Sequence, residues 1–291
     1  AHGDVVPRGD VPRLGPAEFR AAVVEACGTG RRIVSLFGHP AADGSIALTA
    51  ILAHDANGRL FAASTRVSDR YPSLTTDCPQ AHWFEREIAE QWAVTPEGHP
   101  WLKPIRFHQP YRPGSTPWCR AGEEPAKPGI TNYFRMEGEE VHEVAVGPVH
   151  AGIIEPGHFR FQCHGENVFH LEIELGYQHR GLERRLRGGP DLKTIHYIET
   201  LAGDTTIGHA MAYCHLLESQ GNVRAPARAQ VLRGVALELE RLANHTGDLG
   251  ALANDIGYLP TASFCGRIRG DWLNLTAILC GNRFGRGLMR P

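Results

Sequence analysis

A run of prolines between residues 104 and 128 divides this chain of 291 residues into two parts. The prolines stand at positions 104, 110, 113, 117, 125 and 128. Because proline lacks a backbone N–H and fixes its own φ angle, such a segment continues neither a helix nor an inner strand. We therefore expect residues 111–140 to form a linker, or an extended arm that lies on a partner, between domains over 1–110 and 141–291.

The part before the prolines has the pattern of an α/β domain. It predicts helices over 16–27 and 83–92 and strands over 32–37, 45–53 and 60–67. Asn57-Gly58 is a strong turn signal between the last two strands. Glu85, Arg86 and Glu87 stand at the start of the second helix, where the helix dipole favours acidic side chains. By itself this motif indicates only a capped helix followed by a docking loop.

The part after the prolines predicts a small antiparallel sheet and then helices alone. Strands are expected over 141–146, 158–163 and 168–173. After Gly176 the pattern is helical, and residues 230–244 place apolar side chains at 232, 235, 239 and 242. The fold class is therefore α+β: an N-terminal α/β sheet domain, then a mainly helical domain that carries a small antiparallel sheet. The chain stops at Pro291, and we expect the C-terminal part of the helical domain to be missing.

Composition and charge argue against several classes of function. With a net charge of −2, nothing in the composition points to nucleic acid or an anionic surface as a partner. No run of about 18 apolar residues predicts a membrane span, so any link to a membrane would go through partner subunits. The seven cysteines include no Cys-x-x-Cys pair, which argues against a zinc or iron–sulfur site held by this chain alone. The 16 histidines favour metal, proton or redox chemistry, although surface positions explain most of them.

Three segments concentrate the residues that could carry redox chemistry. GPVHAGIIEPGHFRF (Gly147–Phe161) and GYQHRGLERRL (Gly176–Leu186) are dense in His, Glu, Arg and Gly. The third, ETLAGDTTIGHAMAYC (Glu199–Cys214), has Ala202-Gly203-Asp204-Thr205 where a Cys-x-x-Cys metal clamp would be sought. The sequence therefore contains the His-, Glu- and Arg-rich half of a redox site and lacks the half that a Cys-x-x-Cys metal clamp would provide.

Two parts of the chain resemble known families. Trp83–Lys103 resembles the small hydrophilic subunit of respiratory complex I, in which a Glu-Arg-Glu helix is followed by a His-Pro loop, and the resemblance covers residues 15–108. Gly147–Phe161 and Gly176–Leu186 resemble the opening of the large subunit of group 4 membrane-bound NiFe hydrogenases and of the homologous quinone-site subunit of complex I. The order of the two parts is similar to the fusion in the formate-hydrogenlyase type. The resemblance implies an N-terminal domain without a cofactor that packs between redox subunits.

The resemblance also implies roles for four residues. Glu183 would relay protons beside the metal if burial raises its pKa, and a helix-capping or salt-bridged glutamate is the simpler alternative. His150 and His158 lie in the segment that presents a histidine to the quinone in complex I, and either could be that histidine. Asp255 corresponds to the aspartate that pairs with this histidine, although by itself it would be a helix-end residue.

The chain departs from the resemblance at the metal. The first two nickel ligands would fall at Ala202 and Thr205, which supply no thiolate, and soft thiolates are what bind nickel and iron in such a site. The quinone-binding tyrosine of complex I would fall at Gly203. Asp204 could be a hard ligand or a proton carrier, but we expect it to cap a helix that starts at Thr205. We therefore expect this chain to bind no metal.

These observations predict a hydrophilic subunit of a membrane-associated oxidoreductase, complex I-like or hydrogenase-like, in which electron transfer is coupled to proton relay without an intact Ni–Fe site. The alternative is a non-catalytic scaffold subunit of such a complex, and a hydrogenase with non-cysteine ligands ranks third. The chain would bind no cofactor itself, apart from a possible quinone. The expected partners are a small iron–sulfur subunit and antiporter-like membrane subunits. The expected location is cytoplasmic, peripheral on the inner face of the cell membrane.

Overall fold

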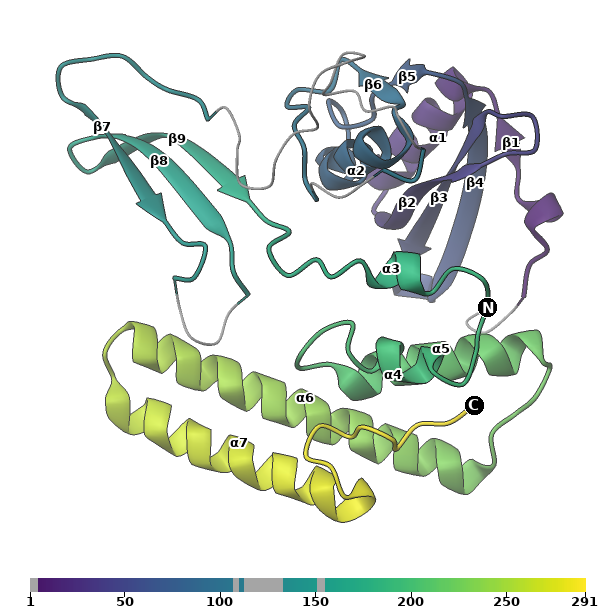
Figure 1. Cartoon of the computed structure of the whole chain (residues 1–291), viewed down its shortest axis with the longest axis vertical. Helices are drawn as coiled ribbons and strands as arrows, with labels where there is room; N and C mark the ends of the chain where they lie inside the picture. The colour runs from purple at the N-terminus through teal and green to yellow at the C-terminus, as the bar shows by residue number, and fades with distance from the viewer. Residues whose placement is uncertain (1–4, 107–109, 113–132, 151–154) are drawn as a thin grey trace. The chain divides into compact units, whose positions relative to one another are not determined.

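The computed structural model describes residues 5–106, 110–112, 133–150 and 155–291. These form two compact units, one mainly of residues 6–179 and one mainly of residues 180–291 (Figure 1). The mixture of sheets and helices confirms the predicted α+β class. Most of the predicted arm, residues 113–132, lies outside the described residues, and the predicted domain boundaries stay a prediction.

The N-terminal sheet has the strand order β1-β4-β3-β2 and packs against helix α1. The bounds are β1 Arg13–Leu14, α1 Pro16–Gly28, β2 Arg32–Pro40, β3 Ile46–His54 and β4 Arg59–Val67. β2, β3 and β4 pair antiparallel, whereas β1 is parallel to β4. Side chains of β3 alternate between buried and half-buried over most of its length, as expected of a strand with one face on a core. The predicted Asn-Gly turn is confirmed: Gly58 has a φ of 61°, which glycine adopts without strain.

A second helix and a short strand pair complete this domain. The bounds are β5 Arg70–Pro72, α2 His82–Trp92 and β6 Thr95–Glu97, with short 3-10 helices at Arg8–Asp10, Asp55–Asn57 and Pro79–Ala81. β5 and β6 pair in parallel. The core between the sheet and the helices contains Phe19 and Val23 of α1, Leu48 of β3 and Ile88 of α2. Both predicted helices and all three predicted strands of this domain are confirmed.

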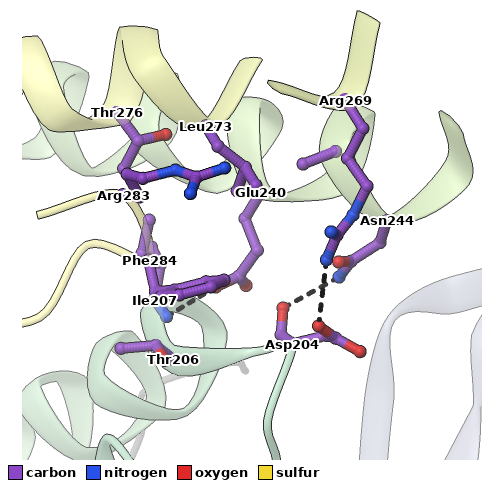
Figure 2. Close-up of a pocket in the computed structure, with 11 residues that line it drawn as sticks. Asp204, Thr206, Ile207, Glu240, Asn244, Arg269, Leu273, Thr276, Arg283 and Phe284 are labelled. Atoms are coloured by element: carbon purple, nitrogen blue, oxygen red, sulfur yellow. Dashed lines mark hydrogen bonds and ion pairs between the residues drawn. The ribbon is translucent and has the colours of Figure 1, made fainter. Parts of the chain in front are cut away.

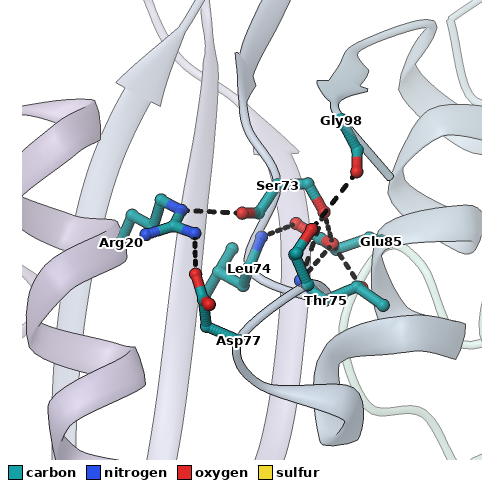
Figure 3. Close-up of polar contacts among 8 residues, drawn as sticks. Arg20, Ser73, Leu74, Thr75, Asp77, Glu85 and Gly98 are labelled. Atoms are coloured by element: carbon teal, nitrogen blue, oxygen red, sulfur yellow. Dashed lines mark hydrogen bonds and ion pairs between the residues drawn. The ribbon is translucent and has the colours of Figure 1, made fainter. Parts of the chain in front are cut away.

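The acid motif at the start of α2 anchors a loop and leaves its own helix without a side-chain cap. Glu85 is fully buried, and its carboxylate accepts hydrogen bonds from the hydroxyls of Ser73 and Thr75, both at 2.6 Å (Figure 3). It also accepts the backbone N–H groups of Leu74 at 2.9 Å and Thr75 at 3.1 Å. Arg20 of α1 donates to the carbonyl oxygen of Ser73 at 2.8 Å. The expected capping role is therefore wrong, because the loop offers this carboxylate four donors.

The three-stranded antiparallel sheet predicted after the prolines is confirmed. It consists of β7 Val141–Val146, β8 His158–His164 and β9 Asn167–Glu174, in that order. One face carries the buried polar side chains His158, Gln162, Glu172 and Glu174. Against this face lie Lys103, whose ammonium is 2.9 Å from the Glu172 carboxylate, and Phe134, whose backbone N–H donates to the same carboxylate. The opposite face exposes Val144, Val146 and Leu171, so the sheet is polar where it is covered.

The second unit is helical, as predicted. Its helices are α3 Leu182–Arg185, α4 Thr194–Ile198, α5 Thr206–Gln220, α6 Ala227–Asp255 and α7 Leu259–Cys280. The long helices α6 and α7 lie side by side and are joined by a turn over 256–258 (Figure 1). The core contains Ile195 of α4, Ile207 and Cys214 of α5, Ala236 of α6 and Met289. Among the described residues, no helix combines the length and the apolar character that crossing a membrane requires.

Candidate functional site

The two predicted histidines lie at the connection between β7 and β8, where each has a neighbour of its own. His158 is buried, and its Nδ1 lies 3.4 Å from the carbonyl oxygen of Gly147. The ring of His150 packs edge-on against Phe159, with the ring centroids 5.3 Å apart. A Cβ on Gly147 would stand 3.2 Å from Cδ2 of His150 and 2.1 Å from a backbone oxygen, so only glycine fits here. Residues 151–154 of this segment lie outside the described residues.

His158 belongs to a buried polar cluster on the covered face of the small sheet. The Tyr133 ring lies 5.5 Å from the His158 ring, and its hydroxyl donates to the carboxylate of Glu174, which is opposite His158 on β9. The Arg160 guanidinium lies 4.5 Å from the Tyr133 ring centroid. Among the described residues, Nε2 of His158 is buried without a hydrogen-bond partner. If Nδ1 donates to the nearby carbonyl, Nε2 keeps a lone pair that can accept a proton.

The two predicted acids lie in the helical unit, and both are exposed. Glu183 is in α3, which is a single turn of helix. Asp255 is the last residue of α6, which is the position that the simpler alternative predicts for it. The proton relay through Glu183 and the pairing of Asp255 with a hairpin histidine stay predictions.

Polar contacts hold the loop before α5, at the place where the resemblance puts the first metal ligands. Asn244 of α6 donates its side-chain N–H to the carbonyl oxygen of Asp204 at 2.9 Å (Figure 2). The Arg269 guanidinium of α7 lies 3.4 Å from the Asp204 carboxylate. Thr205 is the N-cap residue of α5, and its side chain does not cap the helix. The prediction that Asp204 caps α5 is therefore wrong, because its carboxylate faces Arg269.

The start of α5 is capped by Glu240, from the middle of α6. Its carboxylate accepts the backbone N–H of Ile207 at 2.7 Å and that of Gly208 at 3.0 Å. These are two of the amide groups that a helix start leaves without a partner. Burial raises the pKa of Glu240, and the two N–H bonds act in the opposite direction. Sequence reasoning missed this residue; the available signal is that it stands four residues after Ala236 and three before Ala243, both of which are buried.

A pocket lies between the start of α5 and the helices α6 and α7 (Figure 2). Its empty space of about 290 Å³ includes open solvent, and the room inside it is about that of one water molecule. Its polar and charged lining includes Asp204, Glu240, Asn244, Arg269 and Arg283. Its apolar wall includes Ile207, Leu273 and Phe284. The pocket therefore combines carboxylates and guanidinium groups with a hydrocarbon surface.

The donor set of this pocket does not fit a nickel–iron centre. The loop offers the methyl group of Ala202 and the hydroxyl of Thr205, and neither is a soft thiolate. Cys214 is buried in the core of the unit, and burial raises the pKa of its thiol, which keeps it protonated. In the part of the chain that the structure describes, no three His, Cys, Asp or Glu side chains are grouped to hold a metal ion.

Comparison with known proteins gives matches in both parts of the chain. Residues 29–120 match the family described as respiratory-chain NADH dehydrogenase, 30 Kd subunit. Hydrogenase-4 component G of Escherichia coli (strain K12) is 30% identical over 231 residues, which is 76% of this chain and 41% of that protein. Formate hydrogenlyase subunit 5 of the same strain is 30% identical over 228 residues, which is 75% of this chain and 40% of that protein.

A third relative represents the other branch of the resemblance. The C/D subunit of NADH-quinone oxidoreductase from Bdellovibrio bacteriovorus is 26% identical over 220 residues, which is 72% of this chain and 39% of that protein. The chain therefore spans about two fifths of the length of the curated relatives that it matches. It belongs to the group 4 hydrogenase and complex I family.

Proposed function

We propose that this chain is a hydrophilic subunit of a membrane-associated oxidoreductase, in which it takes part in electron transfer coupled to proton relay without a nickel–iron centre. The observation that carries the proposal is the construction of the loop before α5. Where the resemblance expects thiolates, Asp204 is held by Asn244 and Arg269, and Glu240 fixes the first amides of α5. These contacts support the proposal because they can hold the loop without a metal as its anchor.

Proton relay is supported by the buried groups that can exchange a proton. His158 offers an imidazole nitrogen without a partner among the described residues, beside the Tyr133–Glu174 pair. We propose His158, with His150 on the same hairpin, as the groups that face a quinone. Glu183 and Asp255 are the proposed proton carriers of the helical unit. Their exposure in the described structure leaves both carboxylates within reach of solvent protons.

The electrons would come from a partner, because the chain itself supplies no cluster of cysteines. Its seven cysteines include no Cys-x-x-Cys pair, and iron–sulfur clusters are held by such thiolates. We therefore propose a small iron–sulfur subunit and antiporter-like membrane subunits as partners. Attachment through them would place the chain on the cytoplasmic face of the membrane.

Metal analysis of the purified full-length protein tests the central point. We expect nickel far below one atom per chain by inductively coupled plasma mass spectrometry. Nickel near one per chain would overturn the proposal, because the pocket would then hold the metal through side chains other than thiolates.

Quinone-site inhibitor binding to the assembled complex tests the proposed site. We expect Asp255→Asn to abolish binding and Asp248→Asn, a change of the same kind on the same helix, to leave it intact. The second candidate is a non-catalytic scaffold subunit. The contacts that hold the loop before α5 favour it, because they have a structural role and need no catalytic one. Failure of the inhibitor to bind the wild-type complex would select the scaffold.

A further inference from the structure

We propose that the outer face of the small sheet binds an amphipathic helix of a partner subunit, one that has apolar side chains along one side and lysine or arginine at one end. The outer face consists of six apolar side chains of β7, β8 and β9: Val144, Val146, Phe159, Phe161, Leu171 and Ile173. The inference deepens the proposed function, on which it rests only in taking the chain to be one subunit of a complex.

The two faces of this sheet have the reverse of the usual polarity. The opposite face carries the buried polar cluster described above, and residues 133–136 and Lys103 contact it. On the outer face, Val144, Val146 and Leu171 are 38–40% exposed, and none of the six side chains belongs to either hydrophobic core of the described residues. An antiparallel sheet normally packs its apolar face on a core and leaves its polar face to water. The outer face therefore lacks a covering layer among the residues that the structure describes.

The dimensions of the outer face suit one helix. Three strands that are about 4.8 Å apart make a surface about 10–14 Å wide, and a helix with its side chains is about 10 Å across. The 6 residues of β7 extend over about 20 Å, which is the length of about 13 helical residues. Packing a helix on a sheet is also a common way to bury the apolar face of the sheet. The occupant that fits is therefore a helix of about three to four turns.

The charge at one end of the sheet defines the chemistry of this helix. Glu139 and Glu140 immediately precede β7, and Glu166 lies in the turn that joins β8 and β9 at the same end. All three glutamates are exposed, and Glu139 and Glu166 form no ion pair with a described residue. Near the other end Leu175 extends the apolar surface, and a single exposed glutamate, Glu155, is present. Acidic charge is therefore concentrated at the first end, where it favours lysine or arginine in the partner.

A labelled synthetic peptide tests the inference with the full-length protein. The peptide is a helix of about 18 residues, because shorter helices are marginal in water. It has leucine along one side, glutamine elsewhere and three lysines in its last turn. We expect this peptide to bind the wild-type protein in titrations followed by fluorescence anisotropy.

The apolar contact is tested by matched changes on two sheets. Leu171→Thr should weaken peptide binding about fivefold to tenfold, because it removes apolar contact from the outer face. Leu60→Thr, the same change at an exposed position of β4, should change the affinity less than about twofold. Both changes introduce a residue that strands accept well. Val144→Thr, which keeps the shape of the side chain, should act in the same direction as Leu171→Thr and gives a second measurement if that variant is unstable.

The acidic end is tested by a second matched pair. Glu139→Gln combined with Glu166→Gln should weaken binding about threefold to tenfold at low salt, and the loss should disappear at high salt because exposed charges are screened. Glu155→Gln combined with Glu25→Gln removes the same charge elsewhere and should change the affinity less than about twofold.

Three outcomes would overturn the inference. The first is no binding by the wild-type protein, and the second is an equal loss in a variant and its matched control. The third is a dimer of the chain that Leu171→Thr dissociates in sedimentation experiments, because the occupant of the outer face would then be a second copy. Nickel near one per chain would defeat the proposed function and leave these binding results unchanged, so the two failures are distinguishable.

Discussion

Replacing Glu240 by alanine should release the start of α5 without unfolding the chain. The variant leaves the amides of Ile207 and Gly208 without an acceptor, and they lie 2.7 and 3.0 Å from the carboxylate in the wild-type protein. A buried donor left without its partner costs about 1–3 kcal/mol. Because the pocket is partly open to water, the lower half of this range applies, and the two amides together cost about 2–4 kcal/mol.

Hydrogen exchange measured by mass spectrometry localises this loss. We expect amides in the first two turns of α5 to exchange about 30-fold to several-hundred-fold faster in Glu240→Ala, since each 1.4 kcal/mol is about a tenfold change. The control is Glu238→Ala, two residues away on the same helix. Glu238 is exposed and its carboxylate is 3.0 Å from Arg241, an ion pair worth about 0.5 kcal/mol or less, so exchange in α5 should change about twofold at most.

The result that would refute this reasoning is an unchanged rate. If α5 in Glu240→Ala exchanges within about threefold of the Glu238→Ala control, water replaces the carboxylate at no cost. The loop before α5 would then need another anchor, and the main support for a metal-free loop would be lost.

The pH dependence of stability gives a second check. Burial raises the pKa of Glu240, so the folded state binds this proton more readily than the unfolded state. Wild-type stability relative to Glu240→Ala should therefore increase as the pH falls through the raised pKa toward the ordinary value of 4.5.

Three further perturbations follow from the structure. Glu85→Ala should lower the free energy of unfolding of the N-terminal domain by about 4 kcal/mol in urea titrations, because four hydrogen-bond donors lose their buried acceptor. The control, Glu25→Ala on an exposed helix face, should lower it by less than about 0.5 kcal/mol. His82 should titrate near pH 4 in NMR spectra, because burial lowers its pKa to about 4, and titration near 6.5 would contradict this. As the pH falls, the unfolded state binds this proton before the folded state does. His82 therefore makes the protein lose stability as the pH falls from 6.5 toward 4. Gly285→Ala should lower the midpoint of thermal unfolding more than Gly287→Ala, since both glycines have positive φ angles but only the first Cβ would collide, at 2.5 Å; equal midpoints would show that the loop moves away freely.

Local patterns predicted the elements of this fold well, because strand and helix periodicity depend on neighbouring residues alone. The strands over β2, β3, β4 and β7 to β9 were all found from alternation and turn signals. The helix over 230–244 was also predicted, and it is part of α6. Its buried face, however, follows Ala236 and Ala243, whereas Leu232, Val235 and Leu242 of the apolar stripe are 41–47% exposed. Which face of a helix is buried depends on the helices that pack against it, and the sequence of α6 alone does not show where they lie.

The site was predicted less well for a related reason. The sequence indicated where the thiolates of a metal site were missing, and the structure shows what holds the loop in their absence. Asp204 was predicted to cap α5, but Thr205 is the N-cap residue, and Arg269, 65 residues later in the chain, faces the Asp204 carboxylate. Glu240, which caps α5 in its place, comes from 32 residues further along. Pairings over such distances depend on the packing of α5, α6 and α7, and no local pattern encodes them.

Buried and half-buried acids in this chain act repeatedly as acceptors for the backbone of other segments. Glu85 holds residues 73–75, Glu90 accepts the amides of residues 105 and 106, and Glu199 accepts that of residue 287. Glu172 and Glu240 do the same for residues 134, 207 and 208. A carboxylate that accepts backbone N–H groups is stabilised in its charged form and serves to fix a loop, so it is a poor proton carrier. An acid within a family motif is therefore a candidate for proton relay only if it lacks such donors. By this criterion Glu85 is structural despite its motif, whereas burial raises the pKa of Glu240 even though its carboxylate accepts two amides.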